Sequence, residues 1–297
     1  MPSKERRHTL LFSATIPSLV KTIASSALRS GYSFVDTVGE EEEQTHASVK
    51  QEIVVASLED QVAAVTAILA RESAKPGYKI MVFFTTARQT GFMASMTARC
   101  LRKPIKEIHS RMSQPARTRT SDVFRQAKEG ILFSSDVSAR GMDYPDVTFV
   151  LQVGITEREQ YIHRLGRTAR AGSSVEGGGM LLVAPFELRY MKQALSDMKL
   201  VETPLNSLLS SPIQQEVQAV LHSHHSPEQE LLAKQCYGAW LGFYNGNLRK
   251  CGWDKRELIN QANFYSSTIG LSEVPSLEAK TVGKMGLKGF PGLRIEG

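Results

Sequence analysis

Short, almost wholly apolar runs recur through the middle of the chain. They are KIMVFF (79–84), GILFSS (130–135), VTFVLQV (147–153) and MLLVA (180–184). Because these runs are continuous rather than alternating, they predict buried strands of a parallel sheet that is covered on both faces.

Segments with helical spacing lie between these runs. Residues 57–60 resemble a capping box, and the apolar positions Val62, Val65 and Leu69 follow it. Further helices are predicted at 88–101, 114–127 and 157–168. Because strands alternate with helices, the predicted fold is a doubly wound α/β domain over residues 51–200.

The two ends of the chain have other patterns. Strands predicted at 10–15 and 33–38, with a helix between them, suggest that residues 1–38 are the tail end of another domain. An acidic run typical of a solvated linker covers residues 39–50. Residues 201–297 predict an α-helical extension that ends in a glycine-rich, basic and irregular tail.

Composition narrows the function classes only slightly. The formal charge of +6 permits a nucleic-acid partner without establishing one. The three cysteines contain no CxxC pair, so neither a disulfide framework nor a zinc site is predicted. No apolar run has membrane-spanning length.

The stretch YIHRLGRTAR (161–170) concentrates positive charge. If it is helical throughout, His163, Arg167 and Arg170 share one face. Guanidinium groups match phosphate oxygens and can stabilise the charge that develops in phosphoryl transfer. A solvated basic face is the alternative interpretation.

A second polar stretch, SSDVSARGMDYP (134–145), follows a predicted strand directly. Ligands of open α/β sheets bind at this edge. Gly141 would allow a close backbone approach, and Asp143 could accept a hydrogen bond from a ribose hydroxyl. A turn or helix cap is the alternative.

Together these segments resemble the DEAD-box ATP-dependent RNA helicases. SSDVSARGMDYP resembles motif V of that family and YIHRLGRTARAG resembles motif VI. The further likenesses are LFSATIP (11–17) to motif III, MVFFTTARQT (81–90) to motif IV, and IHSRMSQPAR (108–117) to the Gln-x-x-Arg segment. The order and spacing agree with the family over about residues 5–185.

The resemblance implies a RecA-like sheet and an ATP site shared between two such domains. Arg167 and Arg170 would reach the γ-phosphate of ATP, with Arg170 as the arginine finger. Gly141 and Asp143 would line the nucleotide site, and Asp143 would bind the ribose.

The resemblance also implies an RNA site and a coupling site. Thr86, Arg117 and Ser135 would hold RNA phosphates, so binding would be largely independent of base sequence.

Ser13, Thr15 and His163 would couple the ATP state to the RNA state between the two domains.

ATP and Mg²⁺ are the implied cofactors. The sequence contains neither a G-x-x-x-x-G-K-[ST] loop nor an Asp-Glu-Ala-Asp motif. The Mg²⁺ ligands are therefore expected in a first RecA-like domain that is mostly missing from this sequence, and the isolated chain is expected to be inactive. The chain would be the C-terminal half of a helicase. The alternative is a stand-alone, non-catalytic RNA-binding module.

The region after residue 200 resembles the C-terminal extension of fungal mitochondrial DEAD-box RNA chaperones that act on intron RNAs. The likeness is carried by YGAWLGFYNGNL (237–248), WDKRELINQANFY (253–265) and KMGLKGFPGL (284–293). It implies a mitochondrial monomer that acts on RNA, with intron RNAs among its targets, and has no membrane partner.

Overall fold

The computed structural model describes residues 7–11, 18–35, 49–136, 144–168, 177–223 and 226–296. The chain divides into two compact units, residues 1–48 and residues 49–297.

The first unit contains helix α1 (Ser18–Ala27). After this helix, the Arg29 guanidinium donates a hydrogen bond to the carbonyl of Arg7 at 3.0 Å. The described parts of the two strands predicted here, residues 10–11 and 33–35, are not in strands. The rest of those segments and residues 39–48 of the predicted acidic linker lie outside the described residues, and Lys50 of that linker begins a strand.

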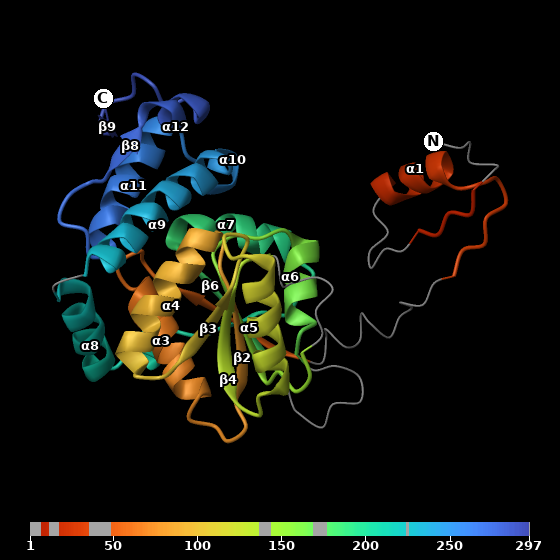
Figure 1. Cartoon of the computed structure of the whole chain (residues 1–297), viewed down its shortest axis with the longest axis horizontal. Helices are drawn as coiled ribbons and strands as arrows, with labels where there is room; N and C mark the ends of the chain where they lie inside the picture. Colours follow the sequence, from red (N-terminus) through yellow and green to blue (C-terminus); the bar gives the residue numbers. More distant parts are fainter. Residues whose placement is uncertain are drawn as a thin grey trace. The chain divides into compact units, whose positions relative to one another are not determined.

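In the described part of the second unit, seven parallel strands form one sheet with the order β3-β4-β2-β5-β6-β1-β7 (Figure 1). The strands are β1 (Lys50–Val55), β2 (Lys79–Phe83), β3 (Ile105–Ile108), β4 (Gly130–Ser134), β5 (Phe149–Val153), β6 (Gly178–Val183) and β7 (Val201–Glu202). The four predicted strands correspond to β2, β4, β5 and β6. The doubly wound, RecA-like α/β fold is confirmed.

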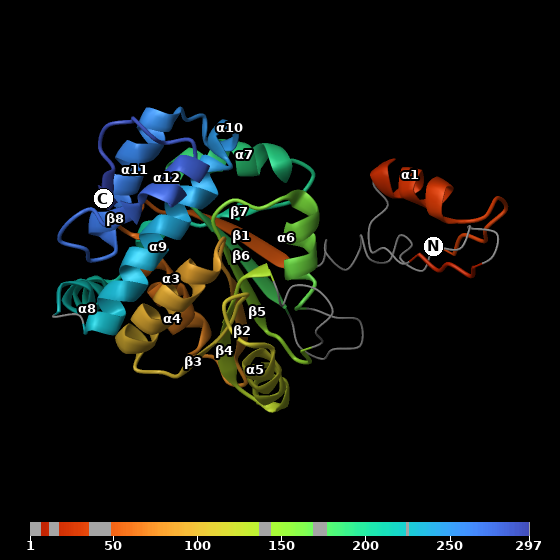
Figure 2. The same ribbon diagram turned by 45° about the horizontal axis from the view of Figure 1, so that its top comes forward.

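Helices cover both faces of this sheet. They are α3 (Gln61–Glu72), α4 (Ala87–Leu101), α5 (Gln114–Gln126), α6 (Arg158–Leu165) and α7 (Pro185–Ala194). Helices α3 and α4 lie on one face, and α5 and α6 lie on the other (Figures 1 and 2). The helix predicted to follow the capping box begins a few residues later than expected, at Gln61. The amide of Asp60 donates to Ser57 Oγ in a turn that precedes α3.

The C-terminal extension is mainly helical, as predicted. It contains a 3₁₀ turn (Leu205–Ser207), α8 (Ser211–His222), α9 (Pro227–Asn245), α10 (Leu248–Cys251), α11 (Lys255–Thr268), β8 (Ser276–Glu278), α12 (Ala279–Lys284) and β9 (Arg294–Glu296). The prediction of an irregular tail is wrong in part, since β9 pairs with β8 and α12 lies between them. Burial of Leu277, Val282 and Leu287 anchors this segment.

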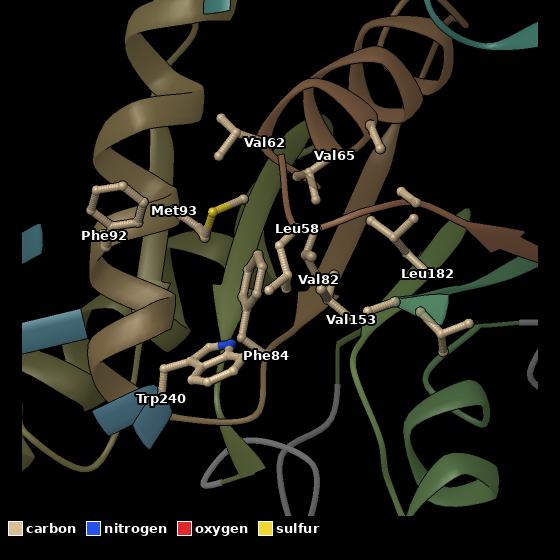
Figure 3. Packing of buried hydrophobic residues seen from close by; sticks show 14 of the residues in the cluster. Leu58, Val62, Val65, Val82, Phe84, Phe92, Met93, Val153, Leu182 and Trp240 are labelled. Atoms are coloured by element: carbon tan, nitrogen blue, oxygen red, sulfur yellow. The ribbon is translucent and has the colours of Figure 1, made fainter. Parts of the chain in front are cut away.

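The extension packs on the same core as the sheet. Helix α3 contacts both α4 and α8, and α4 also contacts α9. Ten of the twelve residues of α3 are buried, because neighbours cover the helix nearly all round. Trp240 of α9 belongs to one hydrophobic cluster with Val82, Phe84 and Met93 (Figure 3).

An aromatic contact adds to this interface. The ring of Phe186 on α7 lies 4.2 Å from that of Trp253 and 5.5 Å from that of Tyr244. The described part of the second unit therefore has a shared core that runs from the sheet into the extension.

Within the described ranges, no helix is both long enough and apolar enough to cross a bilayer.

Candidate functional site

Three neighbouring strands end at one edge of the sheet. The amide of Phe84, just after β2, donates to the carbonyl of Ser134 at 2.9 Å. The amide of Ser135, just after β4, donates to the carbonyl of Ile108 at 3.2 Å. The carboxyl ends of β2, β4 and β3 are thereby linked, at the edge where parallel α/β sheets bind ligands.

Two helices begin at this edge. Thr86 caps α4 by accepting a hydrogen bond from the amide of Gln89 at 3.1 Å. Ser113 caps α5 by accepting one from the amide of Ala116 at 3.4 Å. Helix N-termini present free amides and a partial positive charge, so both starts suit phosphate groups.

The predicted RNA contacts Thr86, Arg117 and Ser135 follow β2, β3 and β4 at this edge. Arg117 lies in the first turn of α5 and donates to the side-chain oxygen of Gln114. Ser135 is almost fully buried at 7% exposure. The structure brings the three residues to the same edge, while their binding role stays a prediction.

Two further arginines at this edge escaped the sequence analysis. Arg88 lies in the first turn of α4, and Arg111 lies on the loop between β3 and α5. Burial, and then the nearby charge of Arg111, lower the pKa of Arg88. Both residues stand inside the quoted motif segments, so the signal was present in the sequence.

The helix predicted over residues 157–168 is shorter than expected. Helix α6 ends at Leu165, with Gly166 as its C-cap. The hydroxyl of Thr168 donates to the carbonyl of Val147 at 2.6 Å, ahead of β5, which draws the chain away from the helix axis. The prediction that Arg167 lies on this helix is therefore wrong, and Arg170 lies outside the described residues.

Arg167 nevertheless stays next to His163. Its Nε donates to the carbonyl of His163 at 3.3 Å, and both residues are half-buried. Burial lowers the pKa of Arg167, and the nearby Tyr144 hydroxyl opposes that shift. A partly dehydrated guanidinium forms stronger charge-assisted hydrogen bonds to an anion than a solvated one.

Arg164 has a structural role that the sequence analysis missed. It is 2% exposed and forms an ion pair with Asp136, which follows β4. Its guanidinium also lies 3.5 Å from the side-chain oxygen of Gln152 and 5.3 Å from the centre of the Phe83 ring. Burial lowers the pKa of Arg164, and Asp136 counteracts this.

These contacts fix α6 against the ends of β4 and β5. The available signal was helical spacing, because Arg164 shares a face with the buried residues Tyr161 and Leu165.

Five predicted site residues fall outside the described residues, namely Ser13, Thr15, Gly141, Asp143 and Arg170. Their roles stay predictions. In the part of the chain that is described, no group of three or more His, Cys, Asp or Glu residues is placed to hold a metal ion. The described arginines fit a phosphate group, whereas no such cluster of carboxylates is described that could hold Mg²⁺.

Sequence comparison identifies similar proteins. Residues 60–172 match the family described as "Helicase conserved C-terminal domain". The chain is 43% identical over 292 residues to "DEAD-box ATP-dependent RNA helicase 31" of Oryza sativa subsp. japonica, covering 98% of this chain and 52% of that protein. It is 43% identical over 295 residues to the Arabidopsis thaliana protein of the same name, covering 98% of this chain and 40% of that protein.

The chain thus spans about half the length of the curated relatives it matches.

Structure comparison agrees. A solved structure titled "Mss116p DEAD-box helicase domain 2 bound to an RNA duplex" matches with a TM-score of 0.67 and 26% identity, covering 84% of this chain and 99% of that one. A second, "DEAD-box helicase Mss116 bound to ssRNA and UDP-BeF", matches with a TM-score of 0.76 and 25% identity, covering 96% of this chain and 58% of that one.

Proposed function

Because this chain belongs to the DEAD-box ATP-dependent RNA helicases and corresponds to their C-terminal half, we propose that it supplies RNA-backbone contacts and ATP-facing arginines to a helicase that unwinds short RNA duplexes. The observation that carries this proposal is the sheet edge where Thr86, Ser135 and Arg117 meet two helix N-termini.

The edge suits a phosphate backbone rather than bases. Its donors are a capping hydroxyl, helix amides and guanidinium groups, all of which bind phosphate oxygens. In support, the similar domain named above was solved bound to an RNA duplex. Binding would then depend little on RNA sequence.

Arg167 and Arg170 are proposed to reach the γ-phosphate, with Arg170 as the arginine finger, and Gly141 and Asp143 to contact the nucleoside. Bound ATP would supply the free energy for unwinding. The described residues fit the phosphate part of this assignment, through the half-buried guanidinium of Arg167. Mg²⁺ would be held by carboxylates outside this sequence.

RNA binding can be tested by fluorescence anisotropy with a labelled single-stranded RNA over a range of salt concentrations. We expect affinity to fall with salt, and Arg117→Ala to weaken binding and reduce the log–log slope by about 0.7, because one phosphate contact is lost.

Arg71→Ala is the matched control for charge. Arg71 lies in the last turn of α3, which runs back from the site edge toward the opposite end of the sheet. Salt-independent binding, or equal losses in the two variants, would contradict the proposal.

The C-terminal half of a helicase and the alternative, a non-catalytic RNA-binding module, are both expected to lack ATPase activity by themselves. We expect residues 1–297 alone to show no RNA-stimulated ATP hydrolysis. Turnover that Arg170→Ala abolishes would contradict this expectation.

An immunoblot of the natural product with an antibody against residues 200–297 distinguishes the two functions. A band at about twice 32.8 kDa, as the length of the relatives suggests, favours the helicase, and a band near 32.8 kDa favours the module.

Mitochondrial location, intron RNA targets and a monomeric state complete the proposal. They rest on the likeness of the extension to fungal mitochondrial proteins. Imaging of the tagged natural product would test the location, and a purely nuclear or cytosolic signal would refute it.

A further inference from the structure

A buried carboxylate joins the extension to the site. Glu187 on α7 is 0% exposed. It accepts hydrogen bonds from the amide of Ala184 at 2.7 Å and from the amide of Ile155 at 3.0 Å. A third comes from the hydroxyl of Tyr244 on α9, at 2.5 Å. One carboxylate therefore ties the extension to the start of the β5–α6 loop.

A second contact holds the end of the same loop. Glu157, the N-cap of α6, forms an ion pair with Lys250 of α10. It also accepts a hydrogen bond from the hydroxyl of Tyr190 at 2.9 Å. The Lys250 ammonium lies 5.0 Å from the centre of the Tyr190 ring. The extension is thus linked to residues 154–157 at both ends, through Glu187 at Ile155 and directly at Glu157.

This loop also borders the RNA edge. Gly154 has a φ of +86°, and a Cβ placed there would lie 2.7 Å from Cγ2 of Thr85. The hydroxyl of Thr85 donates to the side-chain oxygen of Gln89 at 2.8 Å, and the amide of Gln89 donates to Thr86 Oγ1. A displaced loop would therefore press on the connection that carries Thr86.

We propose that Tyr244 and Lys250 of the extension are positioning residues for the RNA and ATP sites. Through Glu187 and Glu157 they hold the β5–α6 loop in place. That loop sets the start of α6, which carries His163 and Arg164, and supports the turn that presents Thr86. The inference rests on the proposed function in that Thr86 is taken to contact RNA and Arg167, which follows α6, is taken to face ATP.

The effect of Tyr244 must be indirect. Its side chain is 3% exposed and cannot touch a bound RNA. Any change in RNA affinity when Tyr244 is substituted must therefore be transmitted by Glu187 and the β5–α6 loop.

The test compares two single-hydroxyl deletions in the same helix. Tyr244→Phe removes the bond to Glu187. Tyr237→Phe is the matched control, because Tyr237 is also buried and its hydroxyl bonds to Asn263 inside the extension at 3.2 Å. RNA affinity would be measured for the full chain at a temperature where both variants are folded.

We expect Tyr244→Phe to raise the dissociation constant for single-stranded RNA by about threefold or more, and Tyr237→Phe to leave it unchanged. Amide exchange, followed by mass spectrometry, should accelerate at residues 84–88 and 154–157 in Tyr244→Phe alone. A merely structural role would change both variants alike, so equal effects would overturn the proposal.

Lys250→Gln provides an independent test if Tyr244→Phe fails to fold. Lys192→Gln is its control, because Lys192 also pairs with a carboxylate, Glu202, and carries the same charge. We expect faster loop exchange and weaker RNA binding in Lys250→Gln only. Equal behaviour of the two lysine variants would again overturn the proposal.

The outcomes also separate this inference from the proposed function. If the unmodified chain binds no RNA, the proposed function fails, and the exchange data alone decide whether the extension holds the loop. If it binds RNA and Tyr244→Phe binds equally well, the inference fails and the proposed function stands.

Discussion

Replacing Gly154 by alanine probes the close contact between the β5–α6 loop and the β2–α4 connection. The glycine has a φ of +86°, in the left-handed region. An alanine held there would cost about 1–2 kcal/mol of stability from backbone sterics alone.

The new methyl group would meet a second penalty. Its carbon would lie 2.7 Å from Cγ2 of Thr85 and 3.4 Å from Oε1 of Glu187. Thr85 is short and its hydroxyl is hydrogen-bonded to Gln89, so it has little room to move. Overpacking of this kind costs about 1–3 kcal/mol. The two penalties together predict a loss of about 2–5 kcal/mol.

Urea denaturation followed by far-UV circular dichroism measures this loss. Gly77→Ala is the matched control, because Gly77 has a φ of +68° and a Cβ there would meet nothing within 4 Å. It should lose only the backbone part, about 1–2 kcal/mol. If both variants lose the same stability, the close approach to Thr85 costs no stability and the packing argument is refuted.

Three further predictions concern buried ionisable groups. Asp136→Ala should destabilise the chain by about 3 kcal/mol or more, because it leaves the buried charge of Arg164 without its partner. Arg164→Met should destabilise the chain by less, because it leaves no buried charge. Denaturation curves of the two variants measure the difference. Burial raises the pKa of Glu187 above its ordinary value of 4.5, so the folded state binds more protons than the unfolded state. Stability should therefore fall as the pH rises from 4.5 through the pKa of the folded state. Glu187→Gln should flatten that fall by up to about 1.4 kcal/mol per pH unit in denaturation series. Burial also raises the pKa of Cys100 to about 11 and of Cys236 and Cys251 to about 12, so native alkylation near neutral pH, followed by mass spectrometry, should be far slower than in denaturant.

The strands that could be predicted from sequence are those buried on both faces. β2 and β5 are wholly buried, and apart from Lys79 and Gln152 their residues are apolar. β1 begins with the polar residues Lys50 and Gln51, and the edge strand β3 contains Lys106 and Glu107. Their polar content hid both strands from an analysis based on apolar runs.

The residues of the site also differ in how far the sequence could place them. Thr86, Arg117 and Ser135 could be placed because each follows a strand in a quoted motif. The partnerships of Arg164 with Asp136 and of Glu187 with Tyr244 could not, because they join residues 28 and 57 positions apart and depend on tertiary packing. The end of α6 was misplaced because it depends on the distant carbonyl of Val147.

The burial of α3 on nearly all sides has a consequence for synthesis of the chain. Its outer side faces α8, so its partner is translated more than a hundred residues after it. At about 5–20 residues per second, the ribosome needs several seconds or more to supply that partner. During this interval the apolar surface of α3 is uncovered, and we expect the nascent chain to be a client of chaperones until α8 and α9 have emerged.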